Sequence, residues 1–247
     1  MKTETPHSTE EKFLQTAAHD LRSPLVTITN LAQLLTLRYR GKLDPKAEEI
    51  IDMIATEALH ADLVVKGLME YLSYTPGTAE EIADQVDMHC ALEKALTDLA
   101  TMREETGAAI TVTELPIVRA RESDMVRVLL HLISNAIAFR GQAPCQIQVS
   151  SSIAENGSAV FCIRDNGLGF NPKFADEIFT PFKRLHGRSR GGSGLGLTLC
   201  KKILDQYGGR IWAESEEGKG SAFYFSLPSA RIRLPADEPV HVTAGVV

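Results

Sequence analysis

Residues 17–25 read AAHDLRSPL and lie within a run of apolar residues that are spaced by fours and threes, namely Leu14, Ala18, Leu21, Leu25, Ile28, Ala32 and Leu35. This heptad pattern is typical of a helix that packs against other helices rather than against a sheet. His19 follows a position of the apolar seam, so its side chain is turned roughly 100° from the buried stripe, toward solvent. Pro24 cannot donate a hydrogen bond to the carbonyl of Asp20, so we expect a bend beside the pair.

The pair His19-Asp20 has two interpretations at this point. An exposed imidazole beside a carboxylate and a local bend suits a reactive histidine. An ordinary surface histidine on a bundle helix explains the segment equally well. The segment alone therefore does not decide between them.

A second heptad run follows the first and consists of Ile51, Ile54, Ala58, Ala61, Val65, Leu68 and Leu72. Between the runs, Gly41 and Asp44-Pro45 are typical of a turn followed by a helix start. We therefore predict an antiparallel helical hairpin over residues 9–74. Two helices bury only one seam between them, and each apolar stripe is wide. We expect a second copy of the hairpin to complete a four-helix bundle, so that the protein is a homodimer.

The composition limits the classes of protein that fit. The chain has 247 residues, of which 44% are hydrophobic and 23% charged, as in globular proteins. The longest apolar stretch, at residues 126–139, is interrupted by polar residues, and the first dozen residues are polar. The four cysteines lack metal-binding spacing, and the net charge of −6 disfavours general nucleic-acid binding. We expect a cytoplasmic protein with reduced thiols, without membrane insertion and without a nucleic-acid partner.

Past a linker at residues 74–81 the pattern changes from helix alone to mixed elements. It predicts helices over residues 88–105, 122–139 and 195–207, and strands over residues 109–113, 146–153, 159–164, 210–213 and 221–227. This order favours an α+β sandwich with helices on one face of a mixed sheet. We therefore divide the chain into a helical domain at residues 9–76, an α+β domain at residues 82–228 and a flexible tail at residues 229–247.

Two glycine-rich segments carry chemistry. Asp165–Phe170 reads DNGLGF directly after a predicted strand, where the aspartate could accept a hydrogen bond from the exocyclic amine of a base. An ordinary Asp-Asn-Gly turn fits the same residues. Gly191–Leu197 reads GGSGLGL and opens a predicted helix, whose free N–H groups and positive dipole end suit phosphate. It matches neither the P-loop nor the dinucleotide fingerprint.

Basic and amide side chains accompany these segments. Lys183, Arg184, Arg188 and Arg190 stand just before the second glycine segment without an intervening acid. The stretch 172–192 is long and ends in glycine, which is typical of a mobile lid. Asn135 lies in a largely apolar helix face. A buried amide there serves either as a structural hydrogen-bonding group or as a ligand for a hydrated cation that phosphates carry. His131 lies one turn earlier on the same side, where a core histidine is the simpler interpretation.

In their order and spacing, these motifs resemble the sensor histidine kinases of two-component systems over residues 9–228. The matching boxes are the phosphoacceptor box at His19–Pro24, the asparagine box at Leu129–Phe139, the first glycine box at Asp165–Gly169, the aromatic box at Phe179–Phe182 and the second glycine box at Gly192–Gly196. The sequences FRG at residues 139–141 and FKRLH at residues 182–186 are similar to the phytochrome-type branch.

The resemblance implies a dimerisation and phosphoacceptor (HisKA) domain followed by an ATP-binding (HATPase_c) domain of the Bergerat, or GHKL, fold. It also implies an ATP site with Mg²⁺. Asp165 would receive the adenine amine, with Gly167 and Gly169 in the same box, and Phe139 would pack near the base. Asn135 would hold the magnesium ion. The phosphates would lie against Gly192, Gly194 and Gly196, with Lys183 or Arg184 offsetting their charge.

The resemblance further implies that His19 is the phosphoacceptor. Asp20 would orient its Nδ1–H or take that proton, and Ser23 stands where a hydroxyl or amide side chain often supports phosphatase activity. The phosphoryl group would pass to an aspartate of a response-regulator receiver domain. Few residues precede the first heptad run, so we expect either a separate sensor partner or a chain cut from a longer kinase.

Three departures from the family pattern keep alternatives open. His131 replaces a frequent asparagine, Ala138 replaces a frequent lysine near the phosphates, and Ser23 stands where a threonine or asparagine is frequent. One alternative is a GHKL ATPase, although those enzymes carry a glutamate at the position of His131 and have no use for His19-Asp20. The other is a catalytically weak dimeric scaffold. This alternative is disfavoured because all five boxes retain residues that are able to perform the chemistry.

Overall fold

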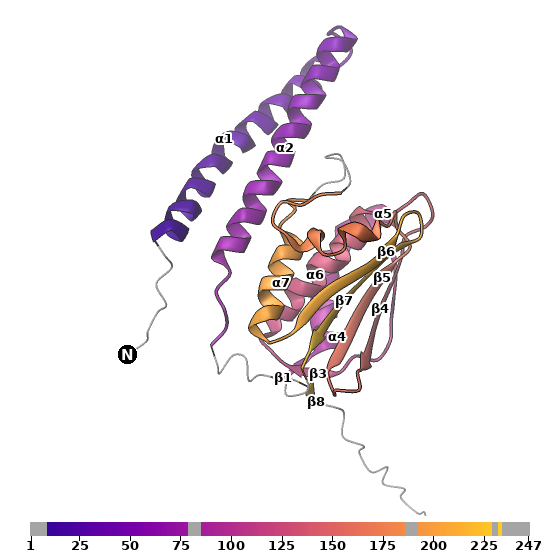
Figure 1. The fold of residues 1–247 in the computed structure, drawn as a ribbon. Helices are drawn as coiled ribbons and strands as arrows, with labels where there is room; N and C mark the ends of the chain where they lie inside the picture. Colours follow the sequence, from indigo (N-terminus) through magenta and orange to yellow (C-terminus); the bar gives the residue numbers. More distant parts are fainter. Residues whose placement is uncertain (1–8, 79–84, 186–191, 229–231, 234–247) are drawn as a thin grey trace, which may run out of the picture.

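The computed structural model describes residues 9–78, 85–185, 192–228 and 232–233. Its first part is a hairpin of two long helices, α1 (Thr9–Tyr39) and α2 (Pro45–Ser73), which stands against an α/β domain (Figure 1). Helix α1 continues through Pro24. Helix α2 begins at the turn expected from the sequence, because the Asp44 side chain accepts hydrogen bonds from the backbone N–H groups of Lys46 and Ala47. The predicted hairpin is confirmed.

The two helices meet along an apolar seam with one charged cluster in it. The buried seam residues are Ala18, Ala32, Ala58, Val65 and Leu72. Asp62, only 7% exposed, pairs with Arg22 of α1 at 3.3 Å and with Lys66 at 2.6 Å. The hydrogen bond from Lys66, with that from Arg22 and both positive charges, keeps the pKa of Asp62 below its ordinary value despite burial. This carboxylate therefore ties the hairpin together as an ion.

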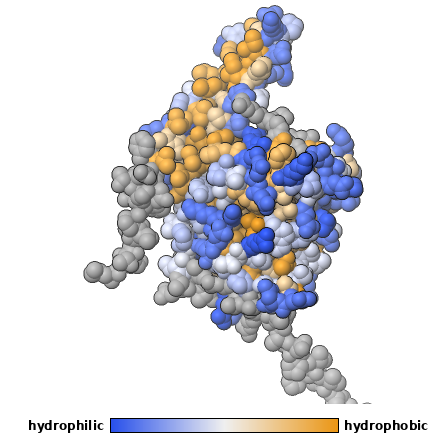
Figure 2. All heavy atoms as spheres, in the orientation of Figure 1, coloured by the Kyte–Doolittle hydropathy of each residue, from blue (hydrophilic) through white to orange (hydrophobic). Residues whose placement is uncertain are grey.

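A wide apolar surface remains uncovered on the hairpin. The exposed side chains include Leu14, Leu21, Ile28, Leu35 and Ile54 of the two heptad runs, with Leu31, Leu34 and Met53 beside them. Figure 2 shows apolar surface gathered over the helices of the hairpin. Contiguous exposed apolar surface of this kind marks an interaction face. One hairpin therefore buries only part of its own heptad pattern, as the width of the stripes predicted.

The second part is a five-stranded sheet covered on one face by helices (Figure 1). Its strands, in spatial order, are β2 (Ala109–Val112), β4 (Gln146–Ile153), β5 (Ala159–Asp165), β7 (Gly220–Leu227) and β6 (Arg210–Glu216). β2 runs parallel to β4 and the remaining pairs are antiparallel, so the sheet is mixed. The covering helices are α4 (Met88–Asp98), α5 (Ala100–Thr106), α6 (Glu122–Ala138) and α7 (Gly196–Gln206). The predicted α+β sandwich is confirmed.

Three short strands were not predicted. β1 (Gln85–Asp87), β3 (Ile117–Arg119) and β8 (Ile232–Arg233) form a second small sheet. The helix predicted over residues 88–105 is interrupted at Leu99, whose φ of −96° and ψ of 6° separate α4 from α5. Two 3-10 turns, η1 (Pro172–Phe174) and η2 (Glu177–Phe179), lie in the predicted lid. Residues 186–191 of that lid and the predicted tail, apart from Ile232 and Arg233, lie outside the described residues.

The core of the α/β domain lies between α6, α7 and the sheet. Leu129, Leu132 and Ile133 of α6 are fully buried, and Phe161 stacks on Phe225 of the neighbouring strand at 4.6 Å between ring centroids. All four cysteines are free thiols. Within the described ranges, no helix combines the length and the apolar character needed to cross a bilayer.

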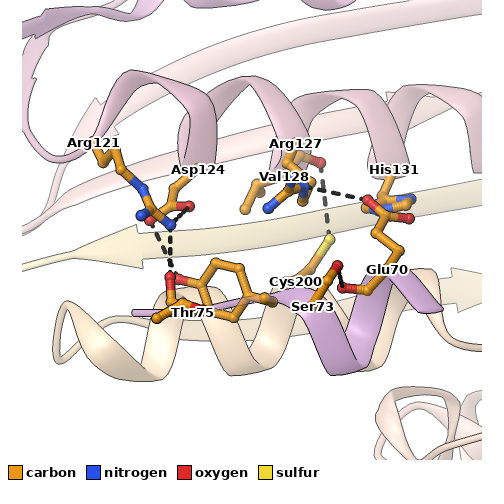
Figure 3. Close-up of polar contacts among 10 residues, drawn as sticks. Glu70, Ser73, Thr75, Arg121, Asp124, Arg127, Val128, His131 and Cys200 are labelled. Carbon is orange, nitrogen blue, oxygen red and sulfur yellow. Dashed lines mark hydrogen bonds and ion pairs between the residues drawn. The ribbon is translucent and has the colours of Figure 1, made fainter. Parts of the chain in front are cut away.

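One buried carboxylate joins the hairpin to this domain. Asp124, at the start of α6, is 0% exposed, and its Oδ2 accepts hydrogen bonds from Tyr74 at 3.2 Å and from Tyr207 at 2.6 Å. Its Oδ1 lies 2.8 Å from Arg121, which also donates to the carbonyl of Thr75 (Figure 3). Burial, together with the adjacent carboxylate, raises the pKa of both tyrosines above the ordinary value. The segment that leaves α2 is therefore anchored to α6.

Replacing this carboxylate should destabilise the protein strongly. In Asp124→Ala, the partly buried Arg121 and two tyrosine hydroxyls lose this partner, so we expect the free energy of unfolding to fall by about 3 kcal/mol or more. Urea denaturation followed by circular dichroism measures this. Lys94→Ala removes an exposed ion pair with Glu122 and is the control, with an expected change below about 1 kcal/mol. Equal losses in the two variants would contradict the anchoring role.

Candidate nucleotide-binding site

A cavity of about 410 Å³ lies between α6, the start of α7, the described part of the lid and α2. Among the residues predicted to bind nucleotide, those that line it are Asn135, Phe139, Asp165, Gly169, Lys183, Arg184, Gly192, Gly194 and Gly196. Gly167 is adjacent to this set without being part of the lining. The structure therefore brings together residues from three separate boxes of the sequence and the two predicted lid cations.

Asp165 supplies a buried acceptor at one end of the cavity. It is the last residue of β5 and only 7% exposed. Its Oδ1 accepts hydrogen bonds from the backbone N–H of Gly167 at 2.8 Å and of Ser221 at 3.2 Å. Burial raises the pKa of this carboxyl above its ordinary value, although the two backbone bonds oppose the shift. Oδ2 has no hydrogen-bond partner among the described residues, so it is available to a ligand.

The first glycine box depends on close backbone approach. A Cβ on Gly167 would lie 2.5 Å from the carbonyl oxygen of Phe139, the same oxygen that accepts the N–H of Leu168 at 2.9 Å. Gly169 has a φ of +61°, and a Cβ there would lie 2.0 Å from the carbonyl oxygen of Glu216. These glycines therefore fix the loop after Asp165 against the end of α6 and against β6.

Helix α6 presents polar side chains to the cavity. The Asn135 side chain lines it and makes no hydrogen bond to any residue in the described part of the chain. His131, one turn earlier, is 17% exposed and lies with Nε2 at 3.2 Å from Glu70 of α2. His131 is therefore a cavity residue with a partner on the hairpin, which the sequence did not indicate. Ala138 lines the same wall without a polar group.

The two predicted lid cations line the cavity and already have protein partners. Lys183 is ion-paired with Glu177 and lies over the Phe174 ring at 5.4 Å. The Arg184 guanidinium lies 2.9 Å from the imidazole of His60 on α2. Arg188 and Arg190, which belonged to the predicted basic cluster, are outside the described residues.

The second glycine segment leads into α7. Gly194 has a φ of +73°, and its ideal Cβ would lie 3.0 Å from the Cα of Phe182, whose own φ is +62°. A Cβ on Gly196, the first residue of α7, would lie 3.0 Å from Nδ1 of His131. Gly192 has open space around its Cα. The start of α7, with its free N–H groups, thus lines the cavity, where it suits an anion.

The predicted phosphoacceptor lies outside the cavity. The side chains of His19 and Asp20 are each 76% exposed on α1, with Nδ1 at 3.5 Å from Oδ1. The predicted exposure of His19 is confirmed. Ser23 is also exposed, and its carbonyl accepts a hydrogen bond from Thr27. Of the described cavity lining, no residue belongs to α1.

Sequence analysis missed the wall that α2 contributes. Leu63 lines the cavity, and His60 and Glu70 contact its residues. A Cβ on Gly67 would lie 2.2 Å from Oγ of Ser193, so the helix backbone passes directly over the second glycine segment. A glycine inside a strong helical pattern was the one signal of close approach that the sequence offered.

The fold and the site define an ATP-binding domain of the GHKL class joined to a phosphoacceptor hairpin. The family model of the His Kinase A (phospho-acceptor) domain matches residues 9–76, and that of the histidine kinase-, DNA gyrase B- and HSP90-like ATPases matches residues 120–231. The chain belongs to the histidine kinase family.

Curated relatives agree with this assignment. The chain is 40% identical to cyanobacterial phytochrome A of Nostoc sp. over 221 residues, which cover 88% of this chain and 28% of the phytochrome. It is 37% identical to the phytochrome-like protein Cph1 of Synechocystis sp., with 88% of this chain and 29% of that protein covered. The chain thus spans less than a third of the length of these relatives.

Solved structures share the fold. Full-length ShkA in complex with AMPPNP is 23% identical, with a TM-score of 0.62 over 91% of this chain and 46% of that one. The histidine kinase ThkA in complex with the response regulator TrrA is 21% identical, with a TM-score of 0.57 over 88% of this chain and 61% of that one.

The first glycine box offers a direct test of the loop geometry. Gly169→Ala places a Cβ against a carbonyl oxygen at a left-handed backbone position, so we expect a loss of about 2 kcal/mol or more in the free energy of unfolding. Gly141→Ala is the control, because the nearest atom to its Cβ is 4.0 Å away. Thermal unfolding of both variants measures the difference. A Gly169→Ala protein as stable as Gly141→Ala would contradict the described packing.

Proposed function

We propose that the chain is an ATP-dependent protein-histidine kinase that phosphorylates its own His19 and passes the phosphoryl group to an aspartate of a response-regulator receiver domain. The observation that carries this proposal is the cavity itself. It is lined both by Asp165, whose Oδ2 has no partner among the described residues, and by the N-terminus of α7, in a chain that also carries an exposed His19-Asp20 pair. A nucleotide bound there would have an acceptor for its phosphoryl group in His19.

The cavity suits ATP from end to end. Oδ2 of Asp165 would accept the exocyclic amine of adenine, and Phe139 would pack against the base. The phosphates would lie toward Gly192, Gly194 and Gly196, where backbone N–H groups and the helix dipole favour negative charge. Lys183 and Arg184 line that region and add positive charge.

Asn135 is the residue that fits a magnesium ion carried by the phosphates. Its side-chain amide lines the cavity without a partner among the described residues, and an amide oxygen is a hard ligand of the kind that Mg²⁺ prefers. The ion, when bound, offsets charge on the phosphate oxygens during transfer.

The His19-Asp20 pair can perform the acceptor chemistry. Neutral imidazole attacks the γ-phosphorus through Nε2, so that an N–P bond forms while the bond to the ADP oxygen breaks. Asp20 lies 3.5 Å from Nδ1 and can orient that N–H or take its proton. The hydroxyl of Ser23, exposed one turn later, would support a phosphatase activity.

Two partners follow from the surface and from the relatives. The exposed apolar side chains of α1 and α2 are those that a second hairpin would cover, so the functional unit is a homodimer. The response regulator in the ThkA complex supports a receiver domain as the second partner.

The acceptor is tested by labelling the full chain with γ-labelled ATP and Mg²⁺. We expect an acid-labile, base-stable phosphoryl label on the wild type, and a reduction to background in His19→Gln because the attacking nitrogen is gone. His7→Gln is the matched control and should retain the label. Label that persists in His19→Gln would refute the assignment.

The magnesium role of Asn135 makes a separate prediction. Asn135→Ala removes an oxygen ligand worth several kcal/mol in the transition state, so we expect autophosphorylation to fall by about 100-fold or more. Light scattering should still report the dimer, because the substitution is remote from the hairpin surface. Unchanged autophosphorylation would exclude the role.

A further inference from the structure

Helix α2 places one stripe of residues against the nucleotide cavity. The stripe consists of His60, Leu63, Gly67 and Glu70, which follow one another at spacings of three and four and therefore share one helix face. His60 meets Arg184, Gly67 passes over Ser193, and Leu63 lines the cavity. Glu70 is the one carboxylate of the stripe.

Glu70 bridges two side chains of α6 (Figure 3). Its Oε1 lies 3.2 Å from Nε2 of His131 and 3.2 Å from Nε of Arg127. Glu70 and Arg127 are each 34% exposed, whereas His131 is 17% exposed and borders the cavity. The same oxygen thus contacts one residue of the site and one residue outside it.

The charge state of Glu70 determines how the His131 ring is oriented. Burial acts to raise the pKa of Glu70, but the hydrogen bond with His131 and the charges of His131 and Arg127 outweigh it, so the pKa is lowered. An ionised carboxylate only accepts hydrogen bonds, so Nε2 of His131 must carry the proton of this contact. Nδ1 then faces Gly196, whose ideal Cβ position is 3.0 Å away.

A chain of contacts therefore runs from the hairpin to the phosphate end of the cavity. Glu70 holds the ring of His131, and that ring packs against the first residue of α7, whose N–H groups face the cavity. Imidazoles in functional sites are commonly hydrogen-bonded to a carboxylate, which fixes the tautomer and the plane of the ring.

We propose that Glu70 is a positioning residue of the nucleotide site, which fixes His131 against Gly196 so that tight binding of the nucleotide phosphates depends on the docked hairpin. The inference rests on the nucleotide site proposed above. It adds that α2, beyond its partnership with α1, is part of that site.

The test measures binding of Mg²⁺ and AMPPNP to the full chain by calorimetry. Glu70→Ala frees the His131 ring, and loss of one charged hydrogen bond corresponds to about a tenfold higher Kd. Glu70→Gln keeps an oxygen acceptor and should be affected less. Arg127→Ala breaks the other contact of Oε1 without touching His131 and should stay within about twofold of wild type. Far-UV circular dichroism confirms that each variant is folded.

Autophosphorylation gives the second readout. In Glu70→Ala, the KM for ATP should rise with the Kd, while kcat at saturating ATP stays within about twofold, because His19 and Asp20 are untouched. An unchanged Kd in Glu70→Ala would overturn the inference. Equal weakening in Arg127→Ala and Glu70→Ala would also overturn it, since Glu70 would then act only as a clamp between helices. Wild-type protein that binds no nucleotide would overturn the proposed function and this inference together.

Discussion

Helix α2 has to pack against two neighbours at once, and this constraint fixes the relation between the hairpin and the nucleotide cavity. Ala58, Val65 and Leu72 are buried toward α1. His60 and Gly67 contact the walls of the cavity, each two residues after a member of the first set. Two residues correspond to about 200° around a helix, so the two sets lie on nearly opposite faces. A single heptad register therefore serves both interfaces.

The two faces of α2 make contacts that differ in how strongly they stabilise the structure. The face toward α1 is apolar, and it includes the buried Asp62, which is ion-paired with the half-exposed Arg22 and Lys66. The face toward the cavity is polar, and its ion pair between Glu70 and Arg127 is one-third exposed. Contacts of that kind contribute about 1 kcal/mol or less. The end of the helix is different again, because Tyr74 hydrogen-bonds to the fully buried Asp124. The contacts between α2 and the α/β domain are thus weak along the helix and strong at its C-terminal end.

The sequence predicted those parts of the structure that have local causes. Heptad spacing placed both long helices, and alternating residues placed β4 at residues 146–153 as observed. The short strands β1, β3 and β8 were missed because two or three residues carry no detectable period. The glycine boxes predicted the loops of the cavity, since a positive φ or a close backbone approach demands glycine.

Contacts between distant segments could not be predicted in this way. Glu70 and His131 are 61 residues apart, and Arg184 and His60 are 124 residues apart. Nothing in the spacing of either segment specifies such a pair. Arg184 was therefore assigned to phosphate alone, and His131 was assigned to the core, whereas each has a partner on α2. The structure brings most of these residues to one cavity, while their partners depend on the docking of the hairpin.

This docking has a consequence for phosphoryl transfer. Transfer requires the acceptor nitrogen to lie about 3–3.5 Å from the phosphorus. Helix α2 faces the cavity, no described lining residue belongs to α1, and His19 projects into solvent. The described arrangement therefore places α2, and not α1 with its proposed acceptor His19, against the cavity of the same chain (Figure 1). Transfer requires either that the polar contacts along α2 separate or that a second chain supplies its histidine. Of the contacts along α2, the partly exposed ones cost least to break, and the buried anchor at Tyr74 and Asp124 remains as the fixed point of such a movement.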